Sequence, residues 1–494
     1  MTGYPKRMNR ISNAVNTVYL WAMFLGLPLV MRRGYFDITE AKTVFFVICS
    51  AVFLVARGVI AVQQGKPFGF AGVSAGLALA FALICLFSTA FSGRLADVFL
   101  GRRARWQGLG MMLLYALLYV FFPREEIRRE DALRPLFAGL AVTAALAVLN
   151  HQGADPLGVM RRLVEFDRGR YISTLGNINF AGAYFSLVLP PAVWFALGCE
   201  RRRSAVLWII VFLGLWAAVA VRSESTILGL GTALLVMPLL ARSRPEILRR
   251  LPALYLALPL WLQLYGLLCR SRGIFLSALT RAILSPWVCA VWVLAAGGAL
   301  LWSRRKSDGS LQKGAAVYGW GLLAAAAAAV IGLVLLNTVW KAAPLGGAED
   351  WLRFTDSWGT DRGGIWRYCL GLFRDYPLLE KLFGGGAGIL ALLDAGHPYF
   401  PDAILDTAHS EYLQILMNWG LLGLAAYLGW LIAAGKGMLN RQGDLSRAAL
   451  AGLIGYGAQA IVNIAQTPGV ALLFVLIAAA PLSEREIAAR RVMK

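Results

Sequence analysis

The part of the chain best suited to do chemistry reads Asp406-Thr407-Ala408-His409-Ser410-Glu411-Tyr412-Leu413-Gln414. It places one of only three histidines in 494 residues between a polar segment, residues 339–410, and a long apolar run that ends near Gly435. A histidine at the water-facing mouth of a membrane span can be titratable, so His409 is a candidate general base. Asp406 and Glu411 are carboxylates that could orient its imidazole or favour its charged form. The alternative is an interfacial histidine that only caps a helix.

The composition is that of an integral membrane protein. Of the 494 residues, 59% are hydrophobic and only 15% are charged, which is far more apolar than a soluble globular protein. The formal net charge of +21 could indicate a nucleic-acid partner. The Lys and Arg residues fall in short clusters between apolar runs, however. We therefore expect topology signals and contacts to anionic membrane lipid, and no nucleic acid.

Fourteen apolar runs are long enough to span a membrane. They cover approximately residues 15–31, 43–62, 68–90, 107–122, 134–149, 178–198, 205–221, 226–241, 251–269, 286–302, 315–338, 411–434, 447–465 and 470–483. Because some of them could tilt or be re-entrant, the sequence predicts an all-α polytopic membrane helix bundle of about 12–14 transmembrane helices. One large extracytoplasmic loop with short helices interrupts it. The expected parts are an N-terminal transmembrane bundle (1–338), the loop with an amphipathic helix (339–410) and C-terminal transmembrane helices (411–494).

The short basic connections predict how the chain lies in the cytoplasmic membrane. By the positive-inside rule, both termini lie inside and the long loop lies outside. Several outward connections nevertheless keep arginine, which topology alone would deplete: Gly101-Arg102-Arg103-Ala104-Arg105, Arg161, Arg162, Arg168, Arg170, Arg222, Arg270, Arg272, Arg362 and Arg367. Because guanidinium groups bind phosphate oxygens in bidentate fashion, these arginines indicate an anionic ligand. The alternative is a scattered set of solvated or lipid-headgroup arginines.

Two of these arginines are distinguished by their position. Arg222 stands at the end of an apolar run, where a charge costs a few kcal/mol unless it is paired, and Glu224 is its expected local partner. Arg362 begins an amphipathic helix that runs to Pro377, and it is free to point inward. The apolar face of that helix is made by Trp366, Leu370 and Phe373.

A glycine-rich run, Gly384-Gly385-Gly386-Ala387-Gly388, follows this amphipathic helix. It does not have the GxxxxGK[ST] spacing of a nucleotide-binding loop. We expect a turn at which the backbone passes close to a neighbouring segment or to a substrate.

These pieces together resemble a known family. The Asp406-to-Gln414 stretch, continued by Gly420-Leu421-Leu422-Gly423-Leu424, is similar to the carboxy-proximal signature of O-antigen ligase and O-antigen polymerase-like membrane glycosyltransferases. Two earlier segments resemble other elements of that family: Thr174-Leu175-Gly176-Asn177-Ile178-Asn179-Phe180-Ala181-Gly182-Ala183-Tyr184 and Gly101-Arg102-Arg103-Ala104-Arg105-Trp106-Gln107-Gly108. Further elements fall in the matching order, namely Arg222, the helix start at Arg362 and Gln466-Thr467-Pro468.

The resemblance implies an enzyme at the outer face of the cytoplasmic membrane. It would move a glycan from a polyprenyl-pyrophosphate donor to an acceptor hydroxyl of a glycan, a lipid or a protein, without cofactor or metal. His409, Arg222 and Arg362 would be catalytic, because the arginines stabilise charge on the pyrophosphate while His409 takes the acceptor proton. The residues expected to bind substrate are Arg105, Asp406, Glu411, Arg367, Tyr412 and Asn179.

Two alternatives stay open. A polyprenyl-linked glycan flippase or transporter would favour ionisable groups at mid-membrane depth, where Arg57 is the clear case in this chain. A divalent metal could instead be held by histidine and carboxylate side chains, namely His397, Asp402, Asp406, His409 and Glu411, although their spacing is irregular. Within the glycosyltransferase hypothesis, ligase and polymerase are not separated.

Overall fold

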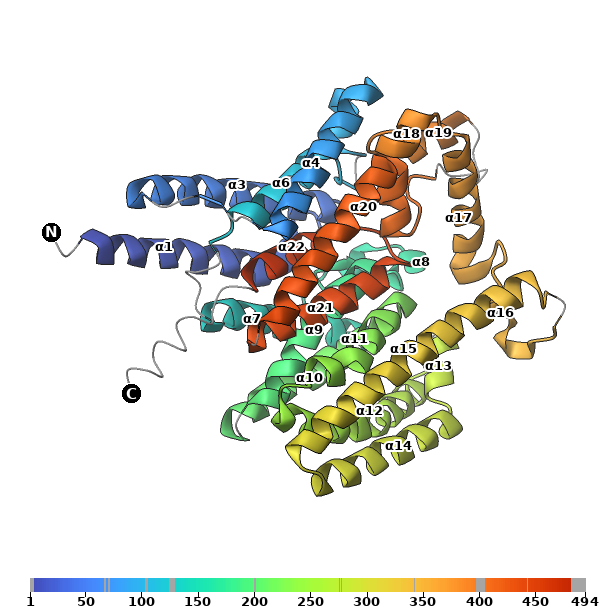
Figure 1. Ribbon diagram of the computed structural model, residues 1–494. Coiled ribbons are helices and arrows are strands. Elements are labelled where there is room, and N and C mark those ends of the chain that lie inside the picture. The colour runs from blue at the N-terminus through green and yellow to red at the C-terminus, as the bar shows by residue number, and fades with distance from the viewer. Residues whose placement is uncertain are drawn as a thin grey trace.

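The structure is a computed structural model that describes residues 4–65, 68–69, 72–102, 105–123, 129–199, 201–274, 276, 278–341, 343–396, 405–441 and 443–480. The described part is almost entirely helical (Figure 1). One short antiparallel hairpin interrupts the helices, in which β1 (Tyr171–Ile172) pairs with β2 (Gly176–Asn177).

The first part of the chain precedes this hairpin and consists of helices and two tight turns. They are α1 (Tyr4–Trp21), the π-helical η1 (Ala22–Gly26), α2 (Leu27–Leu29), α3 (Ile38–Gln64), α4 (Val73–Ser92), α5 (Leu95–Leu100), α6 (Leu109–Phe121), α7 (Arg129–His151), the 3-10 turn η2 (Met160–Arg162) and α8 (Glu165–Arg168). Seven helices follow the hairpin: α9 (Ile178–Gly198), α10 (Arg201–Ala220), α11 (Glu224–Leu240), α12 (Pro245–Ser271), α13 (Ala278–Ile283), α14 (Pro286–Arg305) and α15 (Asp308–Thr338).

The long loop and the C-terminal helices complete the chain. Residues between α15 and α20 form short elements, namely η3 (Gly346–Ala348), α16 (Glu349–Leu352), α17 (Trp358–Asp375), α18 (Leu378–Phe383) and α19 (Ile389–Gly396). The last helices are α20 (Glu411–Asn440), α21 (Asp444–Ala460) and α22 (Gly469–Ala479). Figure 1 shows α17, α18 and α19 together on one side of the molecule, and all three contact α20.

The all-α architecture expected from the sequence is confirmed. Eight described helices are long and apolar enough to cross a membrane: α3, α4, α7, α9, α12, α14, α15 and α20. Four shorter apolar helices accompany them: α6, α11, α22 and the Ala205–Ala220 part of α10. The fourteen apolar runs found in the sequence each overlap a helix, and the run at residues 178–198 coincides with α9.

The centre of the bundle is α9, of whose most apolar window 94% is buried, against 6% for α15. α9 packs against α11 and α21 through small residues, because a Cβ added at Gly455 would lie 2.3 Å from the Ser186 carbonyl oxygen. Helices in a membrane associate through such close packing of small residues, because the surrounding lipid is as apolar as their side chains and supplies no hydrophobic driving force. α12, α14 and α15 lie side by side at the edge of the bundle and expose apolar surface (Figure 1).

The glycine-rich turn at residues 384–388 packs against a break in α20. At Gly420 the backbone leaves the helical region, with φ 70° and ψ −172°. The break frees two carbonyl groups, and the amides of Gly385 and Gly386 donate to the oxygens of Met417 and Asn418 at 3.2 and 2.9 Å. The turn therefore supplies the hydrogen bonds that the broken helix lacks.

This contact is so close that only glycine fits. A Cβ at Gly420 would lie 2.4 Å from the Leu382 carbonyl carbon, and a Cβ at Gly384 would lie 2.2 Å from the Asn418 oxygen. The predicted close passage of the backbone at this glycine run is confirmed, and the neighbour is α20.

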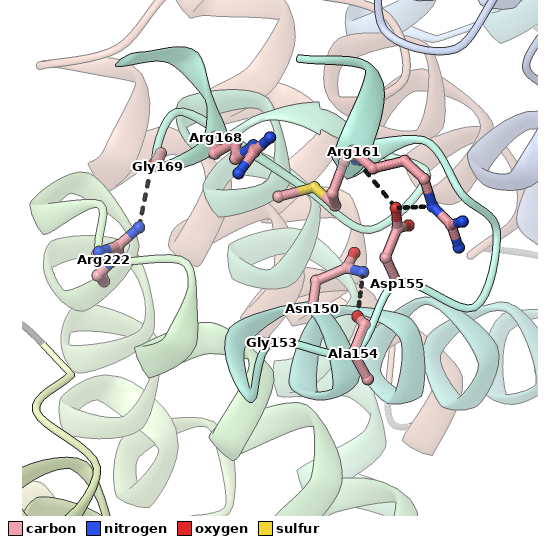
Figure 2. Close-up of a pocket in the computed structure, with 9 residues that line it drawn as sticks. Asn150, Gly153, Ala154, Asp155, Arg161, Arg168, Gly169 and Arg222 are labelled. Atoms are coloured by element: carbon pink, nitrogen blue, oxygen red, sulfur yellow. Dashed lines mark hydrogen bonds and ion pairs between the residues drawn. The ribbon is translucent and has the colours of Figure 1, made fainter. Parts of the chain in front are cut away.

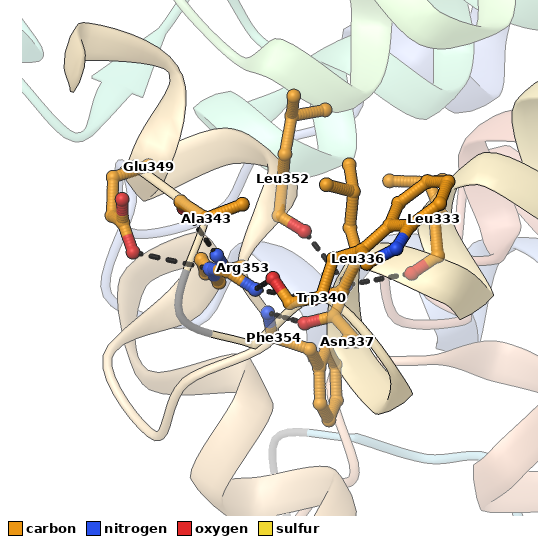
Figure 3. Close-up of polar contacts among 9 residues, drawn as sticks. All are labelled: Leu333, Leu336, Asn337, Trp340, Ala343, Glu349, Leu352, Arg353 and Phe354. Atoms are coloured by element: carbon orange, nitrogen blue, oxygen red, sulfur yellow. Dashed lines mark hydrogen bonds and ion pairs between the residues drawn. The ribbon is translucent and has the colours of Figure 1, made fainter. Parts of the chain in front are cut away.

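A buried arginine fixes the start of the long loop against α15. Arg353 is 7% exposed and its guanidinium donates to the carbonyl oxygens of Leu336, Trp340 (2.9 Å) and Ala343 (2.6 Å), and to the Glu349 carboxylate at 3.2 Å (Figure 3). The last carbonyl groups of a helix have no partner within it, and a cation there also meets the negative end of the helix dipole. Arg353 therefore acts as a C-terminal cap for α15.

We predict that Gly420→Ala destabilises the protein by at least about 2 kcal/mol, because the new Cβ meets backbone atoms and the residue must keep a positive φ. The measurement is the apparent Tm of the purified protein in detergent. Gly437→Ala is the matched control on the same helix, since its Cβ meets nothing within 4 Å. Equal Tm values for the two variants would contradict this account of the break.

Candidate active site

The candidate general base sits directly before α20. Ser410 is the N-cap of that helix and accepts a hydrogen bond from the Leu413 amide, so His409 is held just outside the first turn. The His409 backbone is left-handed, with φ 49°, and its side chain is partly buried. The cap therefore fixes the place from which the imidazole projects.

Asp406 fixes the segment of chain that leads to His409. Both oxygens of Asp406 accept from Arg105, at 2.9 and 3.0 Å, and Arg102 approaches at 3.8 Å. The loop that carries these arginines is closed by glycines, since a Cβ at Gly108 would lie 2.3 Å from the Gly101 nitrogen. A bidentate arginine–carboxylate pair is directional, so it fixes the 405–410 segment against this loop.

Arg362 lies near enough to His409 for its charge to act on the imidazole. The regular part of α17 begins at this residue, after three left-handed residues, Gly359 to Asp361. Arg362 is largely buried, it donates to the Gly359 carbonyl, and its Nε has no partner among the described residues. Burial lowers the pKa of its guanidinium, and the nearby Glu224 carboxylate acts in the opposite direction. The inward orientation expected for Arg362 agrees with this position.

Burial and neighbouring charge keep the imidazole neutral. Burial is the main cause that lowers the pKa of His409 from 6.5 to about 4, the Arg362 and Arg105 charges lower it further, and Asp406 raises it. Asp406 thus favours the charged form, as expected, but burial and the charges of the two guanidinium groups outweigh it. We call His409, Arg362, Arg105 and Asp406 the reaction centre.

Glu411 is placed differently from Asp406. It is 1% exposed, and its two oxygens accept from the hydroxyl groups of Tyr427 and Tyr456, the latter at 2.7 Å. Of the two carboxylates considered for orienting His409, Asp406 is the one whose charge acts on the imidazole. Glu411 ties α20 to α21 inside the bundle.

Arg222 makes its contact away from the four residues of the reaction centre. Among the described residues no ion pair joins it to Glu224, which corrects the expected local pairing. Arg222 instead donates to the Gly169 carbonyl at 3.0 Å, while Glu224 interacts with Arg362. The Arg222 guanidinium is therefore directed to the Gly169 segment, and no contact of it with Arg362 or His409 is found among the described residues.

The remaining predicted substrate-binding residues have structural partners. Asn179 accepts from the Ser223 hydroxyl at 2.8 Å through its side chain, so it holds the turn that carries Arg222. Tyr412 donates to the Gly457 carbonyl at 2.8 Å, which ties α20 to α21. Arg367 forms an ion pair with Asp356 at 2.8 Å, with both side chains more than half exposed.

Arg222 also lines a cavity of about 460 Å³ on the other side of its turn (Figure 2). The wall comes from the end of α7 and the segment up to α8. The lining residues are Asn150, Gly153, Ala154, Asp155, Met160, Arg161, Arg168, Gly169 and Arg222. We call it the arginine cavity. It gathers three arginines from two of the outward connections, Arg161 and Arg168 from one and Arg222 from the next.

Strained backbone conformations occur in the loops described above. Every non-glycine residue with positive φ in the described part of the chain lies in them: Trp106, Ser173, Arg222, Thr360, Asp361 and His409. Each costs of order 1–3 kcal/mol, and such strain persists where the surrounding structure holds it, often at functional sites. The sequence carried no signal for these conformations, because none of the six is glycine.

The residues considered as metal ligands do not form one site in the described part of the chain. His397 and Asp402 lie outside the described residues. Within the described ranges, no group of three or more His, Cys, Asp or Glu side chains is close enough to hold a metal ion. Asp406 is engaged by Arg105, and Glu411 by two tyrosines.

Sequence reasoning missed three partners of these side chains. Tyr427 and Tyr456 gave no signal, because an aromatic residue in an apolar run is ordinary. Asn463 donates to the Asn179 carbonyl at 2.8 Å, and its polar side chain near the end of the apolar run 447–465 could have marked it. Compared with known proteins, the chain matches no protein-family model and no curated protein sequence.

We predict that the imidazole of His409 titrates with a midpoint of about 4. Arg362→Gln is expected to raise the midpoint towards 6.5, because it removes a positive charge, and Asp406→Asn to lower it, because it removes a negative one. NMR of ¹³C-labelled histidine measures this, and loss of the signal in His409→Asn assigns it. Arg374→Gln, on the exposed side of α17, is the control. A midpoint near 6.5 that Arg362→Gln does not move would refute the electrostatic account.

Proposed function

We propose that this protein transfers a glycan from a polyprenyl-pyrophosphate donor to an acceptor hydroxyl at the outer face of the cytoplasmic membrane, as in O-antigen ligase or polymerase-like enzymes. One observation carries the proposal: at the loop that precedes a membrane span, which the Asp406–Arg105 pair fixes, the neutral imidazole of His409 lies within reach of the Arg362 charge. A proton acceptor and a stabiliser of anionic oxygen are the two groups that such a displacement needs.

His409 acts as the general base. The acceptor O–H gives its proton to the imidazole while the acceptor oxygen forms a bond to the anomeric carbon of the donor. Only a neutral imidazole can accept that proton, and His409 is neutral above its pKa of about 4. Asp406, held by Arg105, keeps the loop and the imidazole in place and stabilises the imidazolium that forms.

Arg362 stabilises the leaving group. The bond between the anomeric carbon and the pyrophosphate oxygen breaks, and its electron pair stays on the pyrophosphate. Arg362 has a buried Nε without a partner among the described residues, so its guanidinium keeps a hydrogen-bond donor that a phosphate oxygen could accept from. Arg222, which was expected to share this role, donates to the Gly169 carbonyl instead and is not assigned to the leaving group.

Binding of the donor would also strengthen the base. The Arg362 charge is one cause that lowers the pKa of His409. A bound pyrophosphate offsets this charge, so the pKa of the imidazole rises towards the range in which a base is effective near neutral pH. The base is therefore weak while the site is empty and stronger when the donor is in place.

The flippase alternative is less well supported. Ionisable groups on a transport path face a water-filled cavity or one another. Lys42 is 1% exposed and donates to the carbonyl oxygens of Leu27, Pro28 and Val30 at 2.7 to 3.0 Å, and Arg57 donates to the Ser12 hydroxyl. These buried cations hold helices together.

We expect His409→Ala and Arg362→Gln each to reduce transfer at least about a hundredfold, because each removes one of the two catalytic groups. The assay follows transfer by the purified protein from a polyprenyl-pyrophosphate glycan to a panel of glycan, lipid and protein acceptors. The acceptor that is glycosylated separates ligase from polymerase.

Arg374→Gln is the matched control, since Arg374 lies on α17 like Arg362 but is 80% exposed and pairs with Asp375. It should retain wild-type turnover. Unchanged turnover in His409→Ala would remove the general-base role. No transfer by the wild-type protein to any acceptor would remove the proposed reaction.

A further inference from the structure

The arginine cavity is separate from the reaction centre and has the size of a ligand site. Its volume of about 460 Å³ falls within the range of small-molecule pockets, roughly 300–1,000 Å³. None of the residues of the reaction centre lines it. It lies on the side of the Arg222 turn that faces α7 and α8.

Three guanidinium groups surround this space from different directions. Figure 2 shows Arg222 and Arg168 on one side of the cavity and Arg161 with Asp155 on the other. Arg222 donates to the Gly169 carbonyl, and Arg168 donates through Nε to the Leu163 carbonyl at 3.3 Å. No other hydrogen bond of these two guanidinium groups to a described residue is found, so most of their N–H groups can bind a ligand.

The cavity carries a net positive charge that its own wall does not neutralise. Asp155 is the one carboxylate among the lining residues, against three arginines. Its oxygens accept from the backbone amides of Val159 and Arg161 at 3.0 Å, and the Arg161 guanidinium is 3.6 Å away. Asp155 therefore shapes the turn, and two guanidinium charges remain for a ligand.

The wall is fixed before any ligand arrives. The Asn150 side chain donates to the Ala154 carbonyl at 3.0 Å and accepts from the Ser173 amide at 2.9 Å. Tyr35 donates to the Ser173 carbonyl, which ties the hairpin to the first helices. Arg222 and Ser173 both have a left-handed backbone, so the chain holds costly conformations on two sides of this cavity.

We propose that the arginine cavity binds a phosphoryl group, as a phosphate ester or a diphosphate. A carboxylate is planar and is satisfied by one guanidinium, whereas a phosphoryl group presents oxygens in three directions and carries up to two charges. Three arginines around a site with two uncompensated charges suit the second ligand. The site does not depend on the proposed glycosyl transfer, because its residues and its wall are distinct from the reaction centre.

The experiment measures binding of inorganic pyrophosphate to the purified full-length protein by titration calorimetry. The Arg362→Gln background removes binding at the reaction centre. Adding Arg168→Gln or Arg161→Gln to it should weaken the remaining pyrophosphate binding at least tenfold. Adding Arg374→Gln should leave it unchanged. The Tm of each variant establishes that it is folded, and Arg168→Lys, which keeps the charge but not the bidentate geometry, should give an intermediate affinity.

Competition separates the sources of the phosphoryl group. Nanodiscs with phosphatidylglycerol, with phosphatidylcholine, or with added polyprenyl pyrophosphate are compared as competitors of pyrophosphate. Competition by phosphatidylglycerol alone would identify a lipid headgroup, and competition by polyprenyl pyrophosphate alone a diphosphate donor; either supports the site. Equal affinity in the Arg168→Gln, Arg161→Gln and Arg374→Gln variants would overturn the inference, while the effect of His409→Ala on transfer would still decide the proposed function.

Discussion

Positive charge held partly out of water is the constraint on which this site depends. A buried charge is costly unless an opposite charge or hydrogen bonds compensate it. Arg362 is largely buried, with Glu224 as the nearby carboxylate and one guanidinium nitrogen without a described partner. A bound anion would compensate the buried charge of Arg362. Burial is the main reason that His409 is neutral, and the Arg362 charge adds to it, so the base and the anion-binding group are linked electrostatically.

The loops that carry these charges are held by the bundle rather than by their own sequence. Close glycine contacts bring the two ends of the 101–108 loop together and let the 384–388 turn pack against the break in α20. The N-cap at Ser410 and the Asp406–Arg105 pair fix the chain on either side of His409. Left-handed residues can persist there because the packing around them determines the backbone. Such loops give a site with little need to rearrange before it binds.

Much of the fold could be predicted, because a helix in a membrane must be both long and apolar, and both properties are local. The run at residues 178–198 coincided with α9, and Arg362 was placed correctly at a helix start. The site was predicted less well. Glu224 belongs with Arg362 rather than Arg222, and Glu411 is bound by two tyrosines inside the bundle. Spacing along the chain does not tell which of two nearby charges faces a third that is distant in sequence.

The sequence by itself determined that the chain is a helical bundle with apolar helices of membrane-spanning length, that it carries an excess of arginine, and that one histidine stands before a long helix. These follow from composition and from hydrophobic runs, which act over a few residues. Only the tertiary structure decided which arginine charges act on His409, that its imidazole is neutral, and that Arg161, Arg168 and Arg222 line one cavity. Those facts depend on contacts between segments up to about three hundred residues apart, such as Arg105 with Asp406, and on burial, which no short stretch of sequence specifies.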